Sequence, residues 1–111
     1  MAYIEVVGLK TLNDSMGHAA GDDLLQRVVG HLRAHLRSYD LIIRIGGDEF
    51  LCAMTDMTLL DARERFRQVA GMLADSGQVG WIRAGLAELG PDDDATQLIE
   101  RADAELSASR A

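Results

Sequence analysis

A pair of glycines followed by a pair of acidic residues constrains the fold of this chain most. Residues 46–48 (GGD) separate two short apolar runs, residues 41–45 and 49–54, and the second run begins with Glu49. Two such runs joined by a turn that contains glycine predict a β-hairpin. Glycine adopts backbone angles that a side chain would block, and it lets a ligand approach the backbone closely. The predicted hairpin tip therefore presents Asp48 and Glu49, although composition alone is also satisfied by an ordinary solvated turn.

Short strands and amphipathic helices alternate along the chain. Short apolar runs rich in β-branched residues predict four strands, at residues 3–7, 41–45, 49–54 and 79–89. Apolar residues at helical spacing predict three helices, at residues 20–36, at 58–74 and from about residue 95. Residues 13–15 (NDS) are typical of a turn before the first helix. Thr58 and the acidic run 92–94 are expected to cap the other two helices.

The predicted order of elements is β-α-β-β-α-β-α. Its first six elements match the split βαβ, ferredoxin-like arrangement, in which the first and third strands are neighbours. We therefore predict an α+β fold with a ferredoxin-like βαββαβ core, an antiparallel central sheet with helices packed on one face, and an extra C-terminal helix. The length suits a single domain over residues 1–111. This fold hosts many activities, so it assigns no function alone.

Composition excludes several classes of protein. The formal net charge of −7 argues against a binder of nucleic acid polymers, which needs a basic face. No run approaches the roughly 18 apolar residues of a membrane span, and the N-terminus lacks the features of a signal peptide. Cys52 is the only cysteine, so no internal disulfide can form. A cytoplasmic domain is expected, which can be a piece of a longer protein.

Five segments resemble motifs of the GGDEF, or diguanylate cyclase, family in that family's order and spacing. They are residues 8–14 (GLKTLND), 17–22 (GHAAGD), 37–40 (RSYD), 46–50 (GGDEF) and 102–106 (ADAEL). The similarity runs from about Ile4 to Arg110. One such motif is weak evidence, whereas five in register favour membership. The resemblance implies the nucleotide-cyclase-like variant of the predicted fold.

The resemblance also implies an activity and a metal site. Members of the family condense two GTP molecules into cyclic di-GMP and release pyrophosphate, in a site formed by a homodimer of facing domains. Mg²⁺ or Mn²⁺ would neutralise phosphate charge and lower the pKa of the attacking 3′-hydroxyl. By resemblance, Asp48 is a metal ligand, and Glu49 is a metal ligand or the proton acceptor. Glu5 and the carbonyl of Val6 would complete the protein's share of the ligands.

GTP binding is assigned to further residues by the same resemblance. Asn13 and Asp22 would bind guanine, because a carboxylate can accept from its N–H groups and an amide can address its acceptor edge. Taken alone, Asn13 is an ordinary turn residue and Asp22 an ordinary acid at a helix start. Phosphate contacts are expected from Leu9, Lys10, Arg44 and Arg110. Arg44 is also expected to have a catalytic role. A solvated arginine at a helix end explains Arg110 equally well.

Arg37 and Asp40 stand where the family binds its product, cyclic di-GMP, as an inhibitor. An arginine can stack on guanine and can pair with its Hoogsteen edge or with a phosphate. The simpler interpretation is an arginine at a helix C-terminus followed by an aspartate in a turn.

The chain also departs from the family pattern. Glu5 replaces the usual Asp, Val7 stands where the first strand usually carries its second acid, and Arg83 stands where Ser is common. A helix and a motif that precede the first strand in the family are expected to be missing. Three functions therefore stay open: a diguanylate cyclase, a catalytically weak domain that binds GTP or cyclic di-GMP for regulation, and a structural or dimerisation domain.

Overall fold

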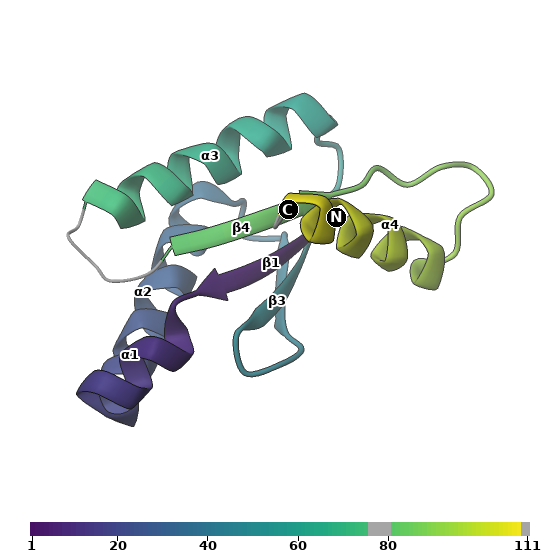
Figure 1. The fold of residues 1–111 in the computed structure, drawn as a ribbon. Coiled ribbons are helices and arrows are strands. Elements are labelled where there is room, and N and C mark those ends of the chain that lie inside the picture. The colour runs from purple at the N-terminus through teal and green to yellow at the C-terminus, as the bar shows by residue number, and fades with distance from the viewer. Residues whose placement is uncertain (76–80, 110–111) are drawn as a thin grey trace.

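The computed structural model describes residues 1–75 and 81–109 and confirms the predicted α+β class (Figure 1). In chain order its elements are β1 (Ala2–Val7), α1 (Leu9–Met16), α2 (His18–His35), β2 (Leu41–Arg44), β3 (Glu49–Ala53), α3 (Leu59–Asp75), β4 (Trp81–Leu86) and α4 (Ala95–Ser109). Among these, no helix is long and apolar enough to cross a lipid bilayer.

The four strands form one antiparallel sheet in the order β2-β3-β1-β4. β1 is central: it pairs with β3 from Ala2 opposite Cys52 to Glu5 opposite Glu49, and with β4 along its whole length. This is the strand order of the ferredoxin-like arrangement, and the predicted contact between the first and third strands is confirmed.

The stretch predicted as a turn before the first helix is itself helical. α1 runs through Asn13, Asp14 and Ser15, and α2 follows after Gly17. Asn, Asp and Ser favour turns because their side chains compete for backbone hydrogen bonds. Here the burial of Leu9 and Leu12 in the main core outweighs that weak local preference. The prediction of a turn was therefore wrong because tertiary packing decides this segment.

The remaining helices and strands differ from prediction by a few residues at their ends. Thr58 caps α3 as predicted, since its Oγ1 accepts a hydrogen bond from the Asp61 N–H at 3.1 Å. β4 ends at Leu86 rather than at residue 89. Beyond it, the Glu88 carbonyl accepts from Arg101 Nη2 at 2.7 Å, so the chain already contacts α4 there. The predicted start of this strand, residues 79–80, lies outside the described residues.

The two faces of the sheet are covered by different helices. Alternate β1 residues Ala2, Ile4 and Val6 point into the main core, which contains buried side chains of α1, α2 and α3. The prediction of helices on one face is therefore right for these three helices. α4 crosses the opposite face, where a smaller cluster contains Ala87, Leu98 and Ala102 with Met1 and Tyr3 packed against it.

α4 approaches β4 so closely that its backbone touches the sheet. A Cβ atom built on Gly85 would lie 2.0 Å from the Ala102 carbonyl oxygen and 2.5 Å from the Leu106 nitrogen. Only a residue without a side chain fits at this crossing. Gly85 pairs with Tyr3 in the sheet, so α4 also lies over the face that carries the Tyr3 ring.

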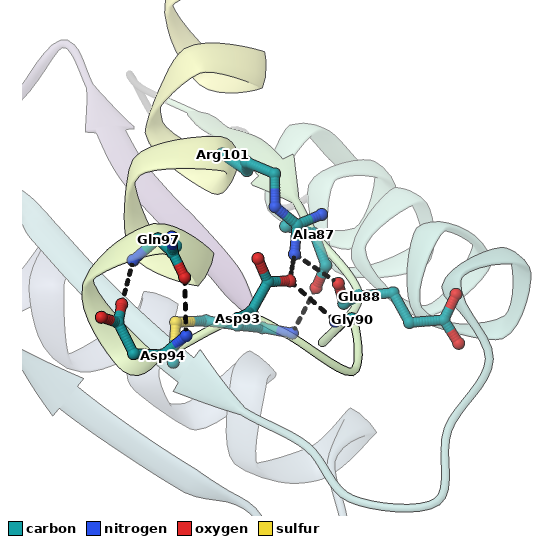
Figure 2. Close-up of polar contacts among 8 residues, drawn as sticks. Ala87, Glu88, Gly90, Asp93, Asp94, Gln97 and Arg101 are labelled. Carbon is teal, nitrogen blue, oxygen red and sulfur yellow. Dashed lines mark hydrogen bonds and ion pairs between the residues drawn. The ribbon is translucent and has the colours of Figure 1, made fainter.

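Polar contacts fix the start of α4 (Figure 2). Asp94 and Gln97 cap the helix reciprocally: the Gln97 N–H donates to Asp94 Oδ1 at 2.8 Å, and the Asp94 N–H donates to Gln97 Oε1 at 2.9 Å. The neighbouring Asp93 accepts from the Gly90 N–H at 2.7 Å and forms an ion pair with Arg101. The predicted acidic cap of the last helix is confirmed at Asp94.

Candidate nucleotide and metal site

The sheet brings two predicted metal ligands together. Glu5 and Glu49 are direct cross-strand partners, so both side chains lie on the face that α4 crosses. The Val6 N–H donates to the Asp48 carbonyl at 2.7 Å, which holds the tip of the β2–β3 hairpin against β1. Side chains of direct partners lie about 5 Å apart at Cβ. Two carboxylates separated by 44 positions in sequence therefore face one site.

Each of these glutamates contacts a further polar side chain. The Tyr3 hydroxyl donates a hydrogen bond to Glu49 Oε2. Arg83 is the cross-strand partner of Glu5 on β4, and its Nη1 lies 4.0 Å from Glu5 Oε1. Because the Tyr3 ring packs against the small cluster under α4, the position of that helix affects how Glu49 is held.

The donor set fits a magnesium ion that is shared with a phosphate ligand. In residues 1–75 and 81–109, no three His, Cys, Asp or Glu side chains converge to hold a metal by themselves. Mg²⁺ usually keeps several waters and needs only one or two carboxylates when substrate phosphates supply the other ligands. Glu5 and Glu49 provide that number of hard oxygen donors from adjacent strands.

A pocket of about 250 Å³ lies between α1 and the hairpin, and Asp48, the residue before Glu49, lines it. Its lining brings three predicted substrate-binding residues together with one predicted metal ligand; these residues are Leu9, Lys10, Asn13 and Asp48. Lys10 is the only lysine of the chain and is exposed there. The pocket therefore combines a cation suited to phosphate with an amide suited to a base.

Asn13, which lines this pocket, carries a buried polar atom without a partner. Its Oδ1 is buried and has no hydrogen-bond partner. A Cβ atom on Gly21 of α2 would lie 1.7 Å from that oxygen, so the side chain occupies space that only glycine leaves open. A buried acceptor without a donor costs free energy, and a ligand that donates a hydrogen bond would recover it. Asp22 follows Gly21, is exposed and is not among the residues that line the pocket.

Of the two arginines predicted to contact phosphate, only Arg44 lies among the described residues. Arg44 folds back over the hairpin turn, where its Nε donates to the Gly46 carbonyl at 3.1 Å and its Nη2 to the Gly47 carbonyl at 2.8 Å. Its side chain thus stabilises the turn that presents Asp48 and Glu49, and a phosphate contact stays a prediction. Arg110 lies outside the described residues.

Arg37 and Asp40 form a closed local unit between α2 and β2. The Asp40 carboxylate accepts from the Arg37 backbone N–H at 2.8 Å and from its Nε at 3.3 Å. The same guanidinium donates to the Thr55 carbonyl and lies 4.7 Å from the centroid of the Tyr39 ring. Burial of Asp40 acts to raise its pKa, but hydrogen bonds from Arg37 outweigh this and hold the pKa below its ordinary value. The simpler structural interpretation of this motif accounts for these contacts.

Removal of the Asp40 carboxylate should destabilise the domain in a pH-dependent way. We expect Asp40→Ala to lower the thermal midpoint at neutral pH by about 5 °C, because the Arg37 N–H loses its acceptor. A lowered pKa in the folded state contributes stability above the ordinary value of 3.8, and this contribution disappears as the pH falls below 3.8 toward the folded-state pKa. Calorimetry should show that the thermal midpoints of the wild type and Asp40→Ala converge as the pH becomes acidic. Equal midpoints at neutral pH would contradict the expectation. Asp103→Ala, on the exposed side of α4, is the control.

The supporting contacts of the site were not predicted from the sequence. Residue pattern gave no role to Tyr3, to Gly21 or to Arg83. The alternation of side chains along β1 could have indicated that Tyr3 and Glu5 share one face. The partners of Gly21 and Arg83 depend on how α1 packs on α2 and on strand register, which residue spacing does not supply.

Comparison with known proteins decides the family. The family model described as "Diguanylate cyclase, GGDEF domain" matches residues 1–111. The chain belongs to the GGDEF family. The predicted resemblance is thereby confirmed over the whole sequence.

Curated relatives and solved structures agree with this assignment. Diguanylate cyclase DgcP of Pseudomonas aeruginosa is 34% identical over 74 residues, which are 67% of this chain and 11% of that protein. Cyclic di-GMP phosphodiesterase PdeB of Shewanella oneidensis is also 34% identical over 74 residues, or 67% of this chain and 9% of that protein. The GGDEF domain of DgcB from Caulobacter crescentus, solved in complex with c-di-GMP, has a TM-score of 0.90 at 23% identity and shares the fold, with 98% of this chain and 70% of that chain covered. This GGDEF domain thus spans a small part of the curated relatives that it matches.

Proposed function

We propose that this GGDEF domain is a diguanylate cyclase, which condenses two GTP molecules into cyclic di-GMP with release of pyrophosphate. Two observations carry the proposal: Glu5 pairs with Glu49 across the sheet, and the adjoining Asp48 lines a pocket together with Lys10 and Asn13. Two acidic oxygen donors, a phosphate-binding cation and an amide for a base are the groups that a metal-dependent reaction of GTP needs. Residues 1–111 would act as one domain in the cytoplasm, where GTP is available.

Each side chain of the site has a distinct task in this proposal. The unpaired Asn13 oxygen accepts a hydrogen bond from a guanine N–H group, and Asp22 approaches the same edge from α2. Lys10, with the backbone around Leu9, holds the terminal phosphates, and Arg44 or Arg110 can add a further cation. Glu5 and Glu49, with Asp48 and the Val6 carbonyl, would hold Mg²⁺ or Mn²⁺. When bound, the metal neutralises phosphate charge and acidifies the attacking hydroxyl.

The reaction requires two copies of this site. One domain holds one GTP, whose 3′-hydroxyl must reach the α-phosphate of a second GTP. A symmetric pair of domains in which identical surfaces face each other satisfies that geometry twice. Glu49, as the alternative proton acceptor, lies on the open part of the α4 face of the sheet. We therefore propose a homodimer as the active form and cyclic di-GMP as a product that can bind back at Arg37 and Asp40.

A second candidate function is a regulatory domain that binds GTP or cyclic di-GMP without turnover. Three observations favour it. Val7 leaves β1 without a second acidic side chain, and Glu5 is already paired with Arg83. A relative of equal similarity is named as a cyclic di-GMP phosphodiesterase rather than as a cyclase.

Glu49→Gln should separate the two functions. With GTP and Mg²⁺, the wild-type domain should form cyclic di-GMP that is detected by mass, at a rate that rises with protein concentration. Loss of the Glu49 carboxylate should lower this rate by at least about 100-fold, the scale of a lost proton acceptor. Glu100→Gln, at an exposed position of α4, should leave the rate unchanged. Absence of product at every protein concentration, while GTP still binds, would instead establish the regulatory function.

A further inference from the structure

Three charged side chains lie in one row across the sheet. Glu49 on β3, Glu5 on β1 and Arg83 on β4 are successive cross-strand partners, so they project from the same face. In such a row, neighbouring side chains are about 5 Å apart at Cβ and interact directly. The row places one permanent positive charge beside two candidate metal ligands.

The Arg83 charge is placed where it affects a metal ion. The Arg83 and Glu5 side chains are only 32% and 17% exposed, so water screens their interaction less than it does at the open surface. A guanidinium cannot lose its proton in a protein. A divalent cation at Glu5 and Glu49 must therefore displace Arg83 from Glu5 or accept its repulsion at short range.

We propose that Arg83 is an internal counter-ion of the Glu5–Glu49 pair that weakens divalent metal binding and thereby sets the metal concentration at which the domain works. Without a bound metal, Arg83 already neutralises part of the negative charge of Glu5. Tyr3 holds the other carboxylate with a neutral hydroxyl and adds no such repulsion. This inference rests on the proposed function, because it takes Glu5 and Glu49 as the metal ligands.

Direct measurement of Mn²⁺ binding tests the counter-ion. Electron paramagnetic resonance reports free Mn²⁺ in a titration with saturating 3′-deoxy-GTP, which lacks the attacking hydroxyl and so stops before chemistry. We expect Arg83→Gln to bind Mn²⁺ about tenfold more tightly than the wild type, on the scale of other groups that contact metal ligands. Arg83→Lys keeps the charge and should stay within about twofold of the wild type. Arg67→Gln removes an arginine that pairs with Glu64 on α3, and it should have no effect.

The outcomes distinguish this inference from the proposed function. Unchanged or weaker Mn²⁺ binding in Arg83→Gln, with cyclic di-GMP still formed by the wild type, would overturn the counter-ion and leave the cyclase standing. Tighter binding in Arg83→Gln without product from any variant would support the counter-ion and remove the cyclase. If no variant binds Mn²⁺ in the presence of the nucleotide, both are rejected. Thermal midpoints of all three variants check that each is folded.

Discussion

Gly21→Ala should weaken guanine nucleotide binding by at least about tenfold, while the domain stays folded. The new Cβ would lie 1.7 Å from Asn13 Oδ1, a distance that the two atoms cannot share, so the Asn13 side chain must leave its place. One lost hydrogen bond to a ligand costs about 1–2 kcal/mol, and a tenfold change in affinity corresponds to 1.4 kcal/mol. Calorimetric titration with 3′-deoxy-GTP and Mg²⁺ measures the effect.

The same substitution at Gly30 provides a matched control. Gly30 lies in the same helix, and a Cβ atom there would meet nothing within 4 Å. Alanine in a helix interior is more favourable than glycine by about 0.5–1 kcal/mol, so Gly30→Ala should stabilise the domain and leave nucleotide binding unchanged. Gly21→Ala should lose that gain because of its contact with Asn13. Equal effects of both substitutions on binding would show that the contact has no functional role.

A double-mutant cycle shows whether Gly21 acts through Asn13. In an Asn13→Ala background the oxygen that Gly21→Ala would strike is absent. Gly21→Ala should then have little further effect on nucleotide affinity and should add the stability expected for a helix interior. Simple additivity of the two losses in affinity would contradict a role of Gly21 in positioning Asn13.

The fold followed from the sequence where local pattern and tertiary packing agree. The strand order could be predicted because the alternation of elements permits few arrangements, and this placed Glu5 opposite the hairpin. α1 could not be predicted because Asn13, Asp14 and Ser15 favour turns locally, while buried Leu9 and Leu12 hold the segment helical. The position of α4 on the opposite face depends on one close crossing at Gly85, which has no periodic signal.

The candidate site could be predicted in its parts but not in its internal contacts. Motif spacing indicated Lys10, Asn13 and the hairpin acids, and the pocket brings Lys10, Asn13 and Asp48 together. The contacts of Glu5 with Arg83 and of Glu49 with Tyr3 depend on register between strands that are far apart in sequence. A motif defines which residues a family uses, whereas the neighbours of those residues decide how strongly they bind a ligand in one chain.

Gly85→Ala tests whether α4 helps to position Glu49 through its packing against Tyr3. The substitution should lower the free energy of unfolding by about 3 kcal/mol, the upper end of overpacking costs, because the new Cβ would lie 2.0 Å from the Ala102 carbonyl oxygen and backbone cannot move aside cheaply. Urea unfolding followed by circular dichroism measures this loss. Gly71→Ala in α3, where a Cβ atom meets nothing within 4 Å, should instead be stabilising.

The effect of Gly85→Ala should extend to the metal ligands. α4 can accept the new methyl group only by moving away from the sheet, and the Tyr3 ring packs against the cluster beneath it. The Tyr3 hydroxyl would then hold Glu49 less firmly, so Mn²⁺ affinity with 3′-deoxy-GTP should fall together with hydrogen-exchange protection of the α4 amides. Tyr3→Phe keeps the ring and removes the hydroxyl, and it should reproduce the loss of Mn²⁺ affinity without the loss of protection. If Gly85→Ala weakens protection while Mn²⁺ affinity stays unchanged, α4 stabilises the fold but does not position Glu49.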